Sequence, residues 1–136
     1  MDKFVSMLLG LKMFVKQYHW LAKGYENHIL ADKLEEELDD YIDEAAELFA
    51  VSSEETHALD AYQVLERAKS FVQETKVVPD TMEDLRGSMI KIITSIMSYC
   101  RQDMGNNELK QPFGDYTGRL SNLLLRKLYL LDVQGK

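Results

Sequence analysis

The sequence predicts an all-α protein built as a bundle of long helices. Apolar residues recur at three- and four-residue steps through most of the 136 residues, which is the period of an amphipathic helix. Prolines, which break helix interiors, stand only at positions 79 and 112. No segment alternates apolar and polar residues as a half-buried strand does. The length suits a single domain over residues 1–136, without a linker or an internal repeat.

Two long helices are predicted over residues 2–23 and 28–50. Gly24 directly follows Lys23, and glycine commonly ends a helix because it adopts the left-handed conformation needed there. The apolar residues of the first helix are Phe4, Leu8, Leu11, Val15, Tyr18 and Leu21. Those of the second are Leu34, Leu38, Tyr41, Ile42, Ala45, Leu48 and Phe49.

A shorter helix is predicted to begin at Ser52 and end near Glu74, because residues 52–55 read Ser-Ser-Glu-Glu, the spacing of a capping box. The residue before Pro79 is pushed out of the helical conformation, so residues 76–79 are expected to be extended. The short helix therefore lies in the connection between the second and third long helices. Its apolar residues are Leu59, Tyr62, Leu65, Ala68 and Val72.

The last two long helices are predicted over residues 80–104 and 116–133. Asp80 and Glu83 have the spacing of a reciprocal cap at the start of the first of them. A loop that contains Pro112 is expected before the second. The expected buried residues are Leu85, Met89, Ile92, Ile93, Ile96, Cys100, Leu120, Leu124, Lys127, Leu128 and Leu131. Four long helices and one short one predict a four-helix bundle.

The charge balance limits the classes of partner. There are 16 basic and 23 acidic residues, a net charge of −7, and a pI near 4.9. Such a field repels nucleic acid and attracts cations, so DNA binding is not expected. Cys100 is the only cysteine, which excludes an intrachain disulfide and a thiolate zinc site. No run approaches the roughly 18 apolar residues of a membrane span, and no signal peptide is recognised, so we expect a cytoplasmic protein.

Four residues with metal-ligand chemistry share one flank of the second predicted helix: His28, Asp32, Asp43 and Glu47. At about 100° per residue, the three carboxylates follow His28 by about 40°, 60° and 100°. The apolar residues of the same helix occupy roughly 200° to 320°. The ligand-type residues are therefore expected to face away from the core, toward solvent or another subunit.

The spacing along this helix predicts a site shared between two chains. Asp32 and Asp43 are separated by about 16 Å of helix, so one ion with bonds of about 2 Å cannot contact both. Two copies of the helix, antiparallel across a two-fold axis near residues 37 and 38, would place His28 and Asp32 opposite the partner's Asp43 and the partner's Glu47. A dyad makes each such contact twice, which predicts two sites per dimer.

The donor set favours a hard or borderline divalent ion. Imidazole and carboxylate suit iron, zinc or manganese, and the lack of thiolate ligands disfavours copper(I) and structural zinc. Carboxylates tolerate ferrous and ferric iron because their negative charge offsets the additional positive charge. Iron is therefore the expected metal.

Three segments resemble the signature of the Dps-type mini-ferritins, the proteins for DNA protection during starvation. Residues 19–24, His-Trp-Leu-Ala-Lys-Gly, are similar to the His-Trp-x-x-Lys-Gly run of that family. Residues 28–32 and 43–47 resemble its two other ligand segments, and residues 115–117 and 127–131 look like its closing helix. The chain is identified as a divergent, shortened member of this ferritin-like family.

The resemblance implies a ferritin-like four-helix bundle with a short extra helix between the second and third helices. It implies that His19, His28 and Asp32 of one subunit, with Asp43 and Glu47 of its two-fold mate, are the ligands of a di-iron site in which zinc or manganese can substitute. It further implies a homo-oligomer, from a two-fold dimer to a dodecameric cage.

The activity expected from this resemblance is that of a ferroxidase, which oxidises ferrous iron with peroxide or dioxygen and stores the ferric product. Trp20 and Tyr18 are expected to hydrogen-bond a water at the site or to intercept radicals. The alternative is a non-catalytic ferritin-like assembly or interaction protein that has lost iron turnover, which the short segment between Gly24 and Asp43 favours. Carboxylates on a helix flank are, in addition, usually a solvated face.

Overall fold

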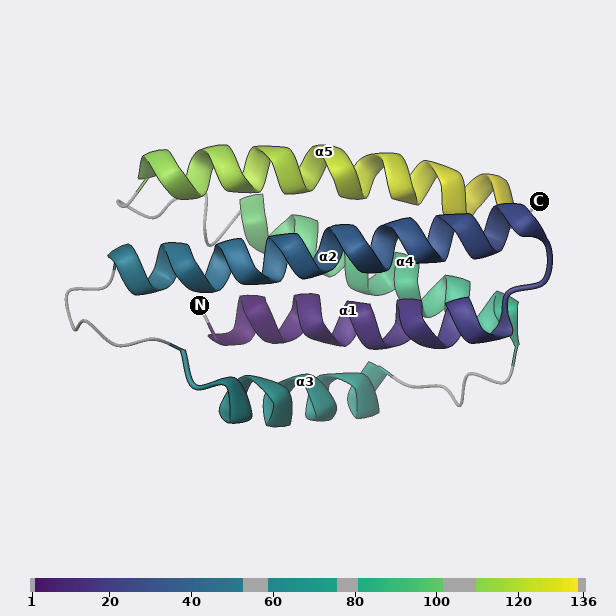
Figure 1. The fold of residues 1–136 in the computed structure, drawn as a ribbon, viewed down its shortest axis with the longest axis horizontal. Coiled ribbons are helices and arrows are strands. Elements are labelled where there is room, and N and C mark those ends of the chain that lie inside the picture. Colours follow the sequence, from purple (N-terminus) through teal and green to yellow (C-terminus); the bar gives the residue numbers. More distant parts are fainter. Residues whose placement is uncertain (1, 53–58, 76–80, 102–109, 135–136) are drawn as a thin grey trace.

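The computed structural model describes residues 2–52, 59–75, 81–101 and 110–134, and within these ranges it contains helices and no strand. The all-α class predicted from the sequence is confirmed (Figure 1). The helices are α1 (Asp2–Leu21), α2 (Tyr25–Ser52), α3 (Ala61–Thr75), α4 (Met82–Tyr99) and α5 (Lys110–Gln134).

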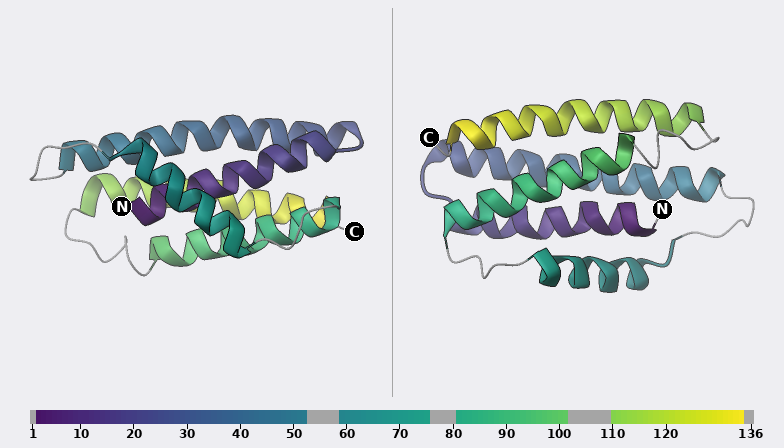
Figure 2. Two further views of the ribbon diagram at one scale, coloured as in Figure 1. Left: turned by 90° about the horizontal axis from the view of Figure 1, so that it is seen from below. Right: turned by 180° about the vertical axis from the view of Figure 1, so that it is seen from behind.

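The four long helices form a square in cross-section. α1 packs against α2 and α4, and α5 packs against the same two helices, so α1 and α5 lie on one diagonal. Each neighbouring pair runs antiparallel, and the long connection between α2 and α4 joins two helices that run in the same direction (Figures 1 and 2). The bundle therefore consists of two antiparallel hairpins, α1–α2 and α4–α5.

The short helix α3 lies outside this square and crosses α1 (Figure 2). The hydroxyl of Ser6 donates to the carbonyl oxygen of Val64 at 3.3 Å. Gly10 allows α1 and α3 to approach closely, because a Cβ at this position would stand 3.0 Å from Cδ1 of Phe71 and the ring would have to shift. The short helix in the connection between the second and third long helices, α2 and α4, was thus predicted correctly.

The buried core consists mainly of the apolar residues predicted on the four long helices. On the short helix α3, two of the apolar positions are instead exposed. Tyr62 and Leu65, which belong to the apolar positions of this helix in the sequence, are 83% and 51% exposed. The physical reason is that α3 packs chiefly on α1 and so buries only a narrow stripe that includes Val64 and Ala68. The predicted residues that are buried are Phe4, Leu8, Leu11, Val15, Tyr18, Leu34, Leu38, Ala45, Ala68, Leu85, Met89, Ile92, Ile93, Ile96, Cys100, Leu120, Leu124, Lys127 and Leu131.

The start of α3 differs from the sequence prediction. Ser52 is the last residue of α2, and residues 53–58, which include most of the predicted capping box, lie outside the described residues. Asp60 caps α3 instead, since its Oδ1 accepts from the backbone N–H groups of Tyr62 at 2.9 Å and Gln63 at 3.3 Å. Aspartate is among the strongest N-cap residues, so this cap is the effective one.

The ends of the last two helices also differ. The Thr81 side chain accepts from the N–H of Asp84 at 3.1 Å and caps α4, whereas Asp80, the predicted cap, lies outside the described residues. Tyr99 is the last residue of α4, and the predicted end of this helix, near Met104, lies outside the described residues. α5 begins six residues earlier than predicted and includes Pro112. Proline is tolerated there because the first N–H groups of a helix have no intrahelical partner.

Cys100 is buried, as predicted, and its burial raises the pKa of the thiol from 9.0 to about 11. Because the thiolate is the reactive form, its fraction at pH 8 is about a hundredfold lower than at the ordinary pKa. We expect iodoacetamide at pH 8 to label the folded protein at least about a hundredfold more slowly than the protein in denaturant. Equal labelling rates would show that Cys100 is accessible.

Over the ranges that the structure describes, no helix combines the length and the apolar character needed to cross a membrane.

Candidate metal centre

Two histidines meet where α1 turns into α2. His19 lies in the last turn of α1, and His28 lies in the first turn of α2. Gly24 allows the tight connection because its φ of 90° belongs to the left-handed region that favours glycine. The Nε2 atoms of the two imidazoles are 3.2 Å apart, and the ring centroids lie 4.3 Å apart in an edge arrangement. Residues nine apart in sequence thus form one imidazole pair at the end of the bundle.

Glu35 of α2 completes this cluster. Its Oε2 lies 3.1 Å from Nδ1 of His19, and its Oε1 lies 2.6 Å from Nζ of Lys16. The Lys16 ammonium lowers the pKa of Glu35 below its usual value; the partial burial of the carboxylate opposes this shift, and His19 adds to it. Glu35 was not among the site residues predicted from the sequence. On the helical wheel, Glu35 lies about 20° before His28, on the side toward the apolar residues. This position could have indicated that Glu35 contacts α1.

The three predicted carboxylates lie on the exposed face of α2, away from the core. Asp32, Asp43 and Glu47 are all exposed, and none forms a hydrogen bond or ion pair with any described residue. The structure does not bring them to the histidine pair. Within the described part of one chain, no three His, Cys, Asp or Glu side chains gather where they could hold one ion. The metal-ligand roles predicted for these residues remain predictions.

The two aromatic residues predicted to assist the site lie in different surroundings. Trp20 is 70% exposed, and Nζ of Lys16 stands 5.9 Å from the centroid of its ring. Tyr18 is buried, and its hydroxyl donates to Oδ1 of Asn27 at 2.8 Å. The amide of Asn27 donates in turn to the carbonyl of Lys23 at 3.2 Å. Tyr18 therefore braces the α1–α2 turn, whereas Trp20 remains open to solvent.

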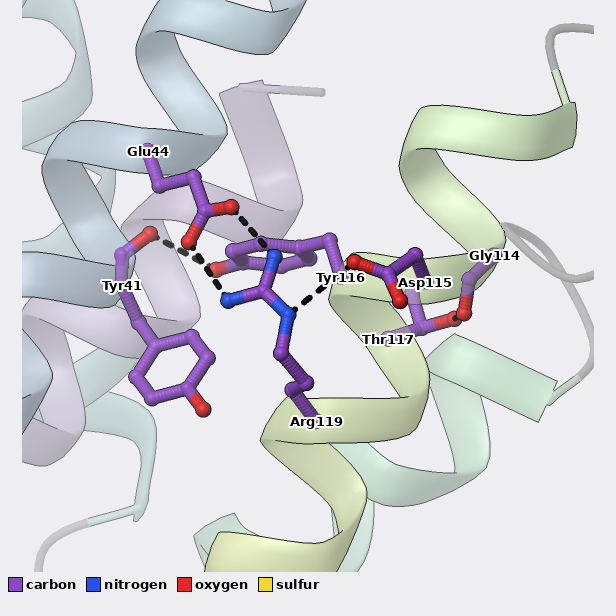
Figure 3. Close-up of polar contacts among 7 residues, drawn as sticks. All are labelled: Tyr41, Glu44, Gly114, Asp115, Tyr116, Thr117 and Arg119. Atoms are coloured by element: carbon purple, nitrogen blue, oxygen red, sulfur yellow. Dashed lines mark hydrogen bonds and ion pairs between the residues drawn. The ribbon is translucent and has the colours of Figure 1, made fainter.

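Polar contacts with α5 hold the second half of α2. The guanidinium of Arg119 contacts both carboxylate oxygens of Glu44, one of them at 3.0 Å, and its Nε donates to Asp115 at 3.1 Å (Figure 3). The buried hydroxyl of Tyr116 donates to the carbonyl oxygen of Tyr41 at 2.7 Å. These contacts fix the rotation of α2 about its axis, and with it the direction of the Asp43 and Glu47 side chains.

Cations neutralise the acidic residues along both edges of α2. Lys12 pairs with Asp39 on the edge that faces α1, and Lys127 lies 3.1 Å from Glu37 on the edge that faces α5. The outward face between these two edges carries carboxylates that form no ion pair with any lysine, arginine or histidine among the described residues.

The described residues thus define the class of protein: an all-helical bundle of four long helices, crossed by a short helix, with an imidazole pair at one end and an acidic face along α2. No family model matches the chain, and no curated protein or solved structure matches it. The resemblance to the mini-ferritins therefore depends on the motif residues of the sequence.

Proposed function

We propose that this protein is a ferritin-like ferroxidase and iron-storage protein, whose His/carboxylate sites are shared between two subunits. Ferrous iron is the substrate. The observation that carries the proposal is the imidazole pair of His19 and His28, with Nε2 atoms 3.2 Å apart, at the edge of the outward acidic face of α2. Imidazole and carboxylate together form the donor set expected for iron.

A second subunit supplies what one chain lacks. The described part of one chain provides two imidazoles but no third converging ligand. An antiparallel copy of α2 would add the partner's Asp43 and the partner's Glu47 to His19, His28 and Asp32. Two acidic faces repel each other in close contact, and bound divalent ions offset this repulsion. Dimer formation and iron binding are therefore coupled.

The residues have distinct roles in the proposed reaction. The two histidines bind iron through Nε2, Asp32 binds on the same side, and the partner's Glu47 bridges two ions. Each ferrous ion loses one electron, and peroxide accepts two electrons and two protons to give two water molecules. Trp20 follows His19 in sequence, is exposed and lines the groove between α1 and α3; its proposed roles are to donate its indole N–H to a water or to give an electron to a stray oxidant.

The test is ferrous loading without oxygen, followed by peroxide, with the ferric absorbance recorded over time. Asp32→Ala combined with Glu47→Ala is expected to slow oxidation by more than about tenfold, since loss of partners that merely orient ligands already costs 10–100-fold. The matched control is Glu36→Ala combined with Asp40→Ala, which removes the same charge from the same helix. Equal rates in the first variant and the unmodified protein would contradict the assignment of the site.

A non-catalytic assembly protein is the second candidate, favoured by exposed apolar residues. Leu125, Tyr129 and Val133 are exposed at four-residue steps along the outer face of α5. Met13 and Leu65 contribute to a groove of about 630 Å³ between α1 and α3. This candidate predicts that light scattering finds the same oligomer with and without ferrous iron. The ferroxidase proposal predicts a dimer or larger assembly that depends on the metal.

A further inference from the structure

A carboxylate and two imidazoles form a chain of contacts across the seam between α1 and α2. Glu35 contacts Nδ1 of His19 at 3.1 Å, and Nε2 of His19 lies 3.2 Å from Nε2 of His28. An ionised carboxylate only accepts hydrogen bonds, so Nδ1 of His19 must carry a proton. In the neutral ring, Nε2 of His19 then has a free lone pair that is directed at His28.

We propose that Glu35 is a positioning residue that selects the Nδ1–H tautomer of His19, so that His19 and His28 of one chain close on a single divalent ion. This inference rests on the proposed function only in that it takes both histidines as metal ligands. It adds a residue that the motif does not contain. It also assigns both imidazoles to one ion, so that a second ion in the shared site would be held by carboxylates.

The distance between the two nitrogens supports a single ion. Two nitrogen ligands, each about 2.0–2.1 Å from a tetrahedral ion, lie about 3.3 Å apart. The structure has the two Nε2 atoms at 3.2 Å, so their separation already fits one ion, although each ring must turn until its lone pair points to the ion and not to the other ring.

Without an ion, the same distance is satisfied by a hydrogen bond. Because Nε2 of His19 has a lone pair, Nε2–H of His28 is the donor. Binding of an ion requires His28 to carry its proton on Nδ1 instead, so His28 changes tautomer while His19 is already in the form that binds. Glu35 thus holds His19 in the metal-binding tautomer before an ion arrives, as carboxylates that orient metal-binding histidines do.

Lys16 fixes the carboxylate itself. Its ammonium holds Oε1 of Glu35 at 2.6 Å, which leaves Oε2 for His19. The side chains of Glu35 and His19 are only 15% and 20% exposed, so water competes weakly for this hydrogen bond. The three residues are held by the packing of α1 on α2 and not by a second subunit. The clamp is therefore complete within one chain.

Cobalt(II) binding to a chain that lacks the partner's ligands tests this clamp. Asp43→Asn combined with Glu47→Gln removes the carboxylates that a partner would supply. We expect this double variant to bind one Co²⁺ per chain, with the side-chain resonances of both histidines shifted. Loss of Co²⁺ binding in this variant, or a shift confined to one histidine, would overturn the inference.

Glu35→Gln, made in the same double variant, tests the role of the carboxylate. Glutamine can present either an acceptor or a donor to Nδ1, so it no longer selects one tautomer. We expect Co²⁺ affinity to fall 10–100-fold and the ¹⁵N spectrum of the metal-free protein to show less of the Nδ1–H form of His19. Glu36→Gln is the matched control, with the same charge change one residue away, and is expected to alter the affinity by less than about twofold.

Two results would show that Glu35 has no positioning role: an unchanged ¹⁵N spectrum of His19 in Glu35→Gln, or an equal loss of affinity in Glu36→Gln. Failure of the proposed function is seen separately, in the ferrous oxidation assay of the unmodified protein. Absent oxidation together with intact, Glu35-dependent Co²⁺ binding would contradict the ferroxidase and support the clamp.

Discussion

Tyr116→Ala is expected to lower the free energy of unfolding by about 3–5 kcal/mol, the cost of removing a large aromatic side chain from a core. Tyr116 is completely buried. Its ring packs edge-on against Phe4 at 6.0 Å and Tyr41 at 5.5 Å between centroids. Its hydroxyl donates to the carbonyl of Tyr41 (Figure 3). The substitution therefore removes contacts to α1 and α2 at once. Chemical denaturation, followed by circular dichroism, measures the change.

Two further variants separate the contributions. Tyr116→Phe keeps the ring and removes only the hydrogen bond, so it is expected to cost about 1 kcal/mol. Tyr129→Ala removes an equally large side chain from the same helix, but Tyr129 is 69% exposed, so a change within about 0.5 kcal/mol is expected. A similar loss of stability in Tyr116→Ala and Tyr129→Ala would contradict the packing described for α5.

Ferrous iron under anaerobic conditions is expected to stabilise the folded protein. A ligand that binds only the native state at 100 times its Kd adds about 2.7 kcal/mol to the free energy of unfolding. This gain should raise the Tm of the unmodified protein and should disappear when His19 and His28 are both replaced by alanine. Differential scanning calorimetry with and without the metal measures both effects.

The controls for this prediction concern the ion and the position of the substitution. Magnesium prefers oxygen ligands and keeps several of its waters, so it is expected to raise the Tm less than ferrous iron does. Lys91→Ala changes an exposed residue of α4 and should retain the stabilisation by iron. If the variant without His19 and His28 gained as much stability from iron as the unmodified protein, the metal would have to bind elsewhere.

Local signals explain which helix limits were predicted and which were not. Gly24 separates the first two helices as expected, because its left-handed conformation is a property of the residue itself, but α1 already ends at Leu21 and α2 begins at Tyr25, directly after the glycine. Pro112 was assigned to a loop, yet it lies in the first turn of α5, since proline suits both places. Ser52 and Asp60 both have N-cap chemistry, and the choice between them depends on where α3 meets α1.

The exposure of residues on α3 shows what the apolar periodicity of a helix does not predict. Leu65 belongs to the apolar stripe, but it is half exposed because α3 lies outside the square of long helices and has chiefly α1 as a neighbour. A helical wheel reports which residues share a face and not how wide a face the neighbours cover. The groove between α1 and α3 follows from the same cause.

The sequence by itself determined the helical class, the number of long helices and the exposed flank of α2 with Asp32, Asp43 and Glu47. All three follow from the spacing of residues within single helices, which is a local property. The tertiary structure alone decided that His19 meets His28 and that Glu35 of α2 contacts His19. These contacts depend on the turn at residue 24 and on the packing of α1 against α2, which bring together residues 9 to 16 positions apart.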